Sequence, residues 1–115
     1  MTIEVAAASR TGLGPAATLF RSLGDPARLA IMRRLSTREA NVADLTRELG
    51  LAQSTVSKHL ACLRGCGLVN VRAEGRASVY SLAQPALLEL LAAAEEVLAA
   101  TGNAIALCPS HGQPR

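Results

Sequence analysis

The stretch that decides the fold runs from Gln53 to Arg64 and reads QSTVSKHLACLR. Its apolar residues Val56, Leu60 and Leu63 recur at the spacing of one helical face. The opposite face carries side chains that form hydrogen bonds, and glycines follow directly after the segment. The sequence therefore predicts an amphipathic helix with one polar, solvent-facing side.

The neighbouring segments indicate which motif this helix belongs to. Residues 41–49 read as a short helix capped by Asn41, and Gly50 closes it at a position that suits the left-handed conformation. After the polar helix, residues 68–72 and 77–82 alternate apolar and polar side chains around a glycine turn, which predicts a two-stranded hairpin. A short helix, a tight turn, a polar helix and a hairpin together make a winged helix-turn-helix.

Two more helices are expected before this motif. Pro15 opens the first, which Gly24 ends, and Asp25 with Pro26 starts the second. In the second helix we expect burial of Leu29, Ala30, Ile31 and Leu35 and solvation of Arg28, Arg33, Arg34 and Arg38. The predicted fold class is mainly α with a small β hairpin (α+β).

The last helix runs from Pro85 to Ala100 and is apolar over much of its circumference. A helix of this kind must be covered, most simply by a copy of itself across a two-fold axis, so we expect a homodimer through the terminal helices. We divide the chain into a loose N-terminal arm (1–14), a DNA-binding and dimerisation domain (15–100) and a C-terminal tail (101–115).

The uneven distribution of charge favours a polyanionic partner, because residues 53–76 carry Lys58, Arg64, Arg72 and Arg76 against Glu74 alone. The length of 115 residues fits one small domain. The 12 Lys and Arg residues exceed the 9 Asp and Glu residues, which gives a small positive net charge. Short polar side chains on the polar helix suit base edges and phosphates, and basic side chains of the hairpin suit the flanking backbone or minor groove. The candidate DNA-binding residues are Gln53, Ser54, Thr55, Ser57, Lys58, His59, Arg72 and Arg76. Two alternatives stay open: the Ser/Thr cluster as a mere helix cap and solvated face, and His59 as a structural residue.

Three cysteines, Cys62, Cys66 and Cys108, make an odd number. The start of the chain lacks the basic segment and long apolar run of a signal peptide, and glutamates interrupt the richest apolar segment. We therefore expect a cytoplasmic protein in a reducing compartment, without a membrane span.

Two motifs carry a resemblance to a known family. Residues 23–31 read LGDPARLAI and residues 54–64 read STVSKHLACLR. Together with the turn Glu74-Gly75-Arg76 and with Tyr80, they resemble the ArsR/SmtB family of winged-helix metal-sensing repressors over residues 15–100. The resemblance implies a homodimer that binds operator DNA and releases it when a metal or metalloid, or in some members another signal, is present.

The cysteines are candidate metal ligands. Cys62 and Cys66 lie four residues apart, so a helix places them on one face, and Cys108 can supply a third sulfur from the tail. Three thiolates favour a soft ion, and trigonal sulfur coordination suits cadmium, lead or arsenite better than zinc. Taken singly, Cys62 is better explained as a small buried residue and Cys66 as a helix-end residue, and only the pair together with a tail cysteine, inside this family, favours a set of ligands.

Within the family, the region around Cys62 and Cys66 is similar to the cadmium- and lead-sensing branch. That resemblance implies a ligand set of Cys62, Cys66 and Cys108, with Cys108 from the same chain or its partner, and cadmium or lead as inducer. His111 is a candidate fourth ligand, although a tail histidine is more often solvated. The sites of other branches are missing, since residues 41–49 lack a Cys-x-Cys pair and the last helix lacks Asp and His.

Three alternatives use the same thiols. Arsenite or antimonite suits the same three sulfurs, and a disulfide of Cys108 with Cys62 or Cys66 would make a redox-sensing repressor. The spacing from Cys66 to Arg72 also fits the Cys-x5-Arg loop of phosphatases and arsenate reductases. That loop follows a strand and opens a helix, whereas here the segment leaves a helix and enters a strand. We therefore predict no enzyme, but a metal-responsive repressor that binds a palindromic operator.

Overall fold

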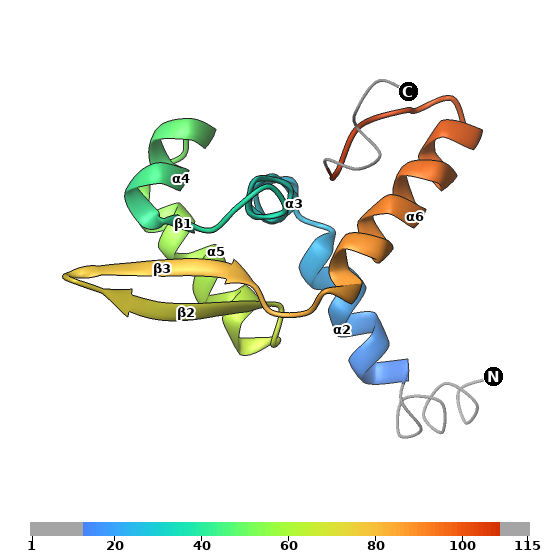
Figure 1. Ribbon diagram of the computed structural model, residues 1–115. Coiled ribbons are helices and arrows are strands. Elements are labelled where there is room, and N and C mark those ends of the chain that lie inside the picture. The colour runs from blue at the N-terminus through green and yellow to red at the C-terminus, as the bar shows by residue number, and fades with distance from the viewer. Residues whose placement is uncertain (1–12, 109–115) are drawn as a thin grey trace.

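The computed structural model describes residues 13–108, which form a helical body with a small sheet projecting to one side (Figure 1). The elements follow the order α2 (Gly14–Leu23), α3 (Pro26–Leu35), β1 (Ala40–Asn41), α4 (Val42–Leu49), α5 (Gln53–Gly65), β2 (Val69–Glu74), β3 (Ala77–Leu82) and α6 (Ala86–Ala100). This order confirms the predicted winged helix-turn-helix, with α5 as the polar helix. The predicted arm, residues 1–14, lies outside the described residues except for its last two positions.

The sheet has one strand more than the predicted hairpin. β2 and β3 pair antiparallel from residues 69–74 to residues 77–82, and we call them, with the turn between them, the wing. β1 pairs with the other edge of β3 through Ala40 with Tyr80 and Asn41 with Val79, so the strand order is β1-β3-β2. A strand of two residues is too short to show an alternating pattern, which is why the sequence predicts the hairpin alone.

Local signals determine where the helices begin and end. The Asp25 carboxylate caps α3 by accepting a hydrogen bond from the backbone N–H of Arg28 at 3.0 Å. Asn41 and Asp44 form a capping box at the start of α4. Gly50 ends α4 with a φ of 67°, a left-handed conformation that a side chain would strain. The chain can therefore turn sharply from α4 into α5.

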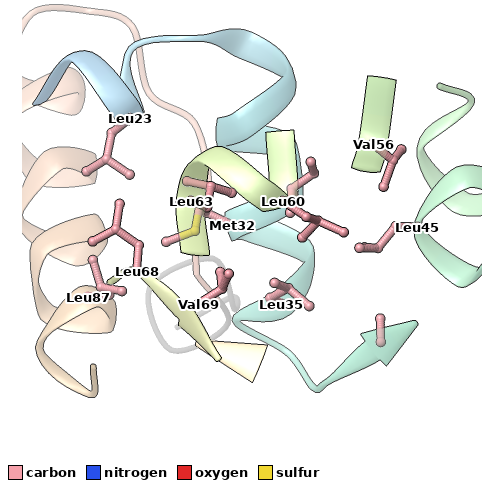
Figure 2. Packing of buried hydrophobic residues seen from close by; sticks show 12 residues of the cluster. Leu23, Met32, Leu35, Leu45, Val56, Leu60, Leu63, Leu68, Val69 and Leu87 are labelled. Carbon is pink, nitrogen blue, oxygen red and sulfur yellow. The ribbon is translucent and has the colours of Figure 1, made fainter. Parts of the chain in front are cut away.

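The core lies between α3, α4, α5 and the sheet. Its largest fully buried side chains are Ile31, Met32, Leu45, Val56, Leu60 and Leu63. Figure 2 shows Met32, Leu60 and Leu63 together near the centre of this cluster. The predicted apolar face of α5 is thus correct. In α3 the prediction was partly wrong, because Met32 is buried whereas Leu29 and Ala30 are only half-buried.

The four arginines predicted as solvated on the second helix divide into two pairs, and Arg38 lies beyond the end of α3 at Leu35. Arg33 and Arg38 are exposed, as expected. Arg34 is not, because its side chain is 12% exposed and its Nε donates to Glu48 of α4 at 2.5 Å. Arg28 is half-buried and bonds to the end of α2. Charge spacing alone could not separate these pairs, since the partners come from other helices.

α6 buries one side and exposes another. Leu87 and Leu91 are buried, whereas Leu88 and Val97 are exposed, as is Phe20 of α2. Figure 1 shows α2 and α6 at the end of the molecule opposite the tip of the wing. Between residues 13 and 108, no helix has both the length and the apolar character that a bilayer crossing needs.

Candidate nucleic-acid interface and cysteine site

The first half of α5 presents polar side chains to solvent. Its exposed residues are Gln53, Ser54, Ser57 and Lys58, and Thr55 is half-buried. Burial of Val56 and Leu60 on the other side holds this polar face outward. The N-cap residue, Ala52, makes no side-chain cap, so N–H groups of the first turn point outward beside the same side chains. The surface can therefore donate several hydrogen bonds to an anion or a base edge.

The wing carries the two predicted arginines in different surroundings. Arg76 is exposed beside Gly75, whose φ of 63° makes the turn. Arg72 donates to Glu74 at 2.6 Å and also to the carboxylate of Glu39. These hydrogen bonds, chiefly the one to Glu74 and then the one to Glu39, raise the pKa of the Arg72 guanidinium above its ordinary value. Arg72 must exchange a carboxylate for a phosphate to contact DNA, whereas Arg76 need not.

His59 faces α3 rather than the polar surface of α5. Its side chain is 17% exposed, its Nδ1 lies 3.2 Å from Arg28 Nη1, and its Nε2 lies 3.6 Å from Asp25 Oδ2. The pKa of the Asp25 carboxyl is lowered chiefly by the backbone N–H of Arg28, and further by the charges of His59 and Arg28. The structural alternative for His59 describes this position well, and a phosphate contact stays a prediction.

Arg28 is the centre of this network, and the sequence reading missed it. Its Nε donates to the carbonyl of Ser22 at 2.6 Å, and its Nη2 donates to the carbonyl of Arg21 at 3.3 Å. Both carbonyls belong to the last turn of α2, where helical acceptors need partners from outside the helix. Arg28 therefore joins the end of α2 to His59 of α5. The sequence did offer a signal for this contact, because Arg28 lies in the first turn of a helix that directly follows another helix.

Cys62 and Cys66 lie one turn apart at the end of α5. The N–H of Cys66 donates to the carbonyl of Cys62 at 3.1 Å, so the helical ladder continues to Cys66, and both residues are exposed. The Sγ of Cys66 lies 3.2 Å from the Oγ of Ser22, a buried residue of α2. Two exposed thiols at this spacing suit one thiophilic ion. Ser22 was not among the predicted site residues.

Cys108 lies apart from this pair. It is 4% exposed and packs with Leu91 and Leu107, and its backbone N–H donates to Glu95 at 2.6 Å. Among residues 13–108, no three His, Cys, Asp or Glu side chains are grouped so as to hold a metal ion. The structure therefore does not bring the three predicted cysteines together. His111 lies outside the described residues.

Known proteins resemble this chain both in sequence and in fold. The family described as "Bacterial regulatory protein, arsR family" matches residues 25–71. The chain is 42% identical to the HTH-type transcriptional regulator Rv0081 of Mycobacterium tuberculosis over 72% of its length and 74% of that protein. The crystal structure of Rv0081 superposes with a TM-score of 0.72 at 40% identity, covering 75% of this chain and 87% of that one.

Two further relatives are named for metals. CmtR of Mycobacterium tuberculosis is 43% identical over 73% of this chain and 71% of that protein. Its NMR structure, described as a cadmium metal-sensor, has a TM-score of 0.61 and covers 71% of this chain and 85% of that one. A probable mercury resistance operon repressor of Streptomyces lividans is 33% identical over 86% of this chain and 82% of that protein.

Proposed function

The chain belongs to the arsR family of bacterial regulatory proteins, and from this premise we propose that it is a repressor which a thiophilic metal ion releases from its operator. It is a DNA-binding transcriptional regulator and not an enzyme. One observation carries the proposal. Cys62 and Cys66 are both exposed at the end of α5, the helix whose first turns carry the polar surface. One rigid element thus holds both candidate sites.

DNA contact is assigned to α5 and the wing. The exposed face of α5, from Gln53 to Lys58, enters the major groove, and Arg76 and Arg72 contact the flanking backbone or minor groove. A regulator of this kind works where the chromosome is, so we assign it to the cytoplasm. Its affinity will depend steeply on salt, because phosphate contacts displace counterions.

A homodimer is proposed on the apolar surface that one chain leaves uncovered. Phe20 of α2 and Val97 of α6 are 61% and 63% exposed, and Leu13 and Leu88 are exposed as well. Large apolar side chains in such numbers favour a partner surface. A second copy related by a two-fold axis would cover them and present two α5 helices to a palindromic operator. The division into an arm (1–14), a domain (15–100) and a tail (101–115) belongs to the same proposal.

The inducer is assigned to Cys62, Cys66 and Cys108, with cadmium or lead as the ion. A soft ion bound there supplies a polarisable centre that prefers sulfur to oxygen ligands. The exposure of Cys62 and of Cys66, the residue after α5, supports this assignment, and Cys108 completes the set from the tail of the same chain or of the partner. The relatives named for cadmium and mercury support a thiophilic inducer in general. Arsenite and antimonite suit the same sulfurs.

Release follows from the shared helix. When the thiol of Cys66 turns toward Cys62 and a third sulfur, it leaves Ser22 Oγ, and the end of α5 shifts against α2. The polar face at the other end of α5 then no longer matches the groove. Coupling of this kind is about 1 to 3 kcal/mol and is reciprocal, so operator DNA must weaken metal binding by the same factor.

The test is operator binding by fluorescence anisotropy in reducing buffer. Cadmium, lead, mercury, arsenite and zinc are titrated against the wild type and against Cys62→Ser, Cys66→Ser and Cys108→Ser. We expect one soft ion to release the wild type while the serine variants stay bound. Lys58→Ala is the matched control, because it should bind DNA more weakly and still bind the ion. Equal operator affinity of the metal-free and metal-loaded wild type would contradict the proposal.

A redox switch is the second candidate, because Cys62 and Cys66 are exposed thiols. Diamide in place of metal ions distinguishes it. Loss of operator binding that dithiothreitol reverses, together with no response to any ion, would favour a disulfide to Cys108.

A further inference from the structure

Among the described residues, the start of the C-terminal tail binds a carboxylate of α6. Glu95 is 6% exposed, and its Oε2 accepts hydrogen bonds from the backbone N–H groups of Leu107 and Cys108, the latter at 2.6 Å. Both hydrogen bonds converge on one oxygen, so a single side chain holds two consecutive residues of the tail. Residues 101–106, which connect α6 to this point, are exposed. After α6 the chain therefore loops away from the helix, and it packs against α6 again at Leu107 and Cys108.

The same two residues are covered by apolar contacts. Cys108 and Leu107 are buried with Leu91, and Leu29 and Leu98 pack against them. The thiol of Cys108 is thereby shielded from solvent, whereas Cys62 and Cys66 are exposed. One chain thus holds two accessible thiols and one that is withheld.

We propose that Glu95 is a latch that withholds Cys108 from metal ions until the tail is released from α6. The metal-binding part rests on the assignment of Cys108 as a ligand under the proposed function. The shielding of the thiol by Glu95 does not rest on it. Glu95 acts through the backbone of residues 107 and 108, so it is a positioning residue and not a ligand.

The latch and the metal site exclude each other. In the part of the chain that the structure describes, the three cysteines are not grouped around one point while Glu95 holds the tail. Within one chain, bringing Cys108 to Cys62 and Cys66 requires residues 107 and 108 to leave the Glu95 carboxylate and the buried cluster around Leu91. The ion must therefore compete with the hydrogen bonds to Glu95 and with the burial of Leu107 and Cys108, and the latch raises the ion concentration at which the repressor responds.

The direct test measures the reactivity of Cys108 in metal-free, reduced protein. Iodoacetamide labelling followed by mass spectrometry gives a separate rate for each cysteine. In Glu95→Ala we expect Cys108 to react about tenfold faster than in the wild type, because the latch bonds are lost. Cys62 and Cys66 serve as internal references and keep their rates. Glu96→Ala is the matched control, since Glu96 is the exposed neighbour on the same helix.

Two further measurements keep the test decisive if Glu95→Ala folds poorly. In the wild type, amide exchange should be slow at Leu107 and Cys108 and fast at Ala104 and Ala106, which lie in the exposed part of the tail. Glu95→Gln, which retains an acceptor oxygen, should label at an intermediate rate. Fast exchange at residues 107 and 108, or a labelling rate of Cys108 that is equal in Glu95→Ala and the wild type, would overturn the latch.

Cadmium binding then separates the latch from the metal site. If the latch competes with the ion, Glu95→Ala should bind cadmium about tenfold more tightly than the wild type, and Glu96→Ala should not. Weaker cadmium binding by Glu95→Ala would mean that Glu95 presents Cys108 instead of withholding it, and would overturn the proposal. If labelling reveals the latch but Cys108→Ser binds and responds to ions as the wild type does, the latch stands and the ligand assignment is wrong.

Discussion

Arg28 joins three parts of the molecule with one side chain, since it donates to carbonyls of Arg21 and Ser22 and lies against His59. Replacing it with alanine removes the side-chain donor from both carbonyls, although the carbonyl of Arg21 keeps the N–H of Gly24 at 3.1 Å. We expect Arg28→Ala to lower the free energy of unfolding by about 2 kcal/mol. Arg33→Ala, on the exposed side of the same helix, should change it by less than about 0.5 kcal/mol. Urea denaturation of both variants measures the difference, and equal effects would contradict the role of Arg28.

Asp25 makes a prediction about pH. Its folded pKa lies below the ordinary value of 3.8, so its ionised form stabilises the native state above that pH, and the contribution is lost as pH falls through the folded value. Asp25→Asn keeps a capping side chain but cannot ionise. We expect its stability to fall less steeply on acidification than that of the wild type. The acid limb will flatten without vanishing, because hydrogen bonds from Arg47 and Arg34 also lower the pKa values of Asp44 and Glu48. Urea denaturation over a series of pH values measures this, and superimposable curves would refute it.

The sequence predicted well which residues share a face of a helix, and it predicted poorly which residues of different helices are in contact. It predicted the polar face of α5 and the one-turn spacing of Cys62 and Cys66, because both depend on helical spacing within one segment. It missed Ser22 beside Cys66 and Arg28 beside His59, which are separated by 44 and 31 positions. The orientation of His59 was left undecided for the same reason. A pattern along one helix cannot show which neighbouring helix supplies the partner.

Among the elements, the helices and strands that are long enough to show a repeating pattern of apolar residues were predicted. The shortest strand, β1, was not. The polar helix was expected from Gln53 and is found at Gln53–Gly65. The two strands of the wing were also expected, because six residues each are enough to show alternation. β1, with two residues, is defined only by its pairing with β3. Strand pairing of this kind depends on the tertiary fold and leaves no local trace.

The wing makes a prediction about salt dependence. Arg76 is exposed at its turn, whereas Arg72 is held by Glu39 and Glu74. Arg76→Ala should weaken operator binding about five- to tenfold and lower the slope of log affinity against log salt by about 1. Arg72→Ala should have a smaller effect, since its carboxylate partners already neutralise it. Anisotropy at several salt concentrations measures both, with Arg33→Ala as a control outside the wing and α5. A larger loss for Arg72→Ala would contradict this ranking.

For the whole molecule, the testable feature is the exposed apolar surface of α2 and α6. If a second copy covers it, a charge placed there must be desolvated on association and will oppose the dimer. We expect Val97→Glu to shift the protein from dimer to monomer in sedimentation or light-scattering measurements. Ala73→Glu places the same charge on an exposed position of β2 and should leave the dimer intact. A dimeric Val97→Glu protein would place the interface elsewhere.

The short distance between the two proposed sites along α5 has a consequence for how regulators of this family can acquire new specificities. The 13 residues of α5 span about 20 Å and carry the surface proposed to read DNA at one end and Cys62 near the other, and Cys66 follows directly as the C-cap residue. The proposed ion site and the proposed DNA surface then lie in one short segment, which packs against the rest of the protein through Val56, Leu60 and Leu63. Exchanging this segment between related scaffolds, with those three core positions kept, should transfer operator preference together with part of the ion preference, as a single inherited unit.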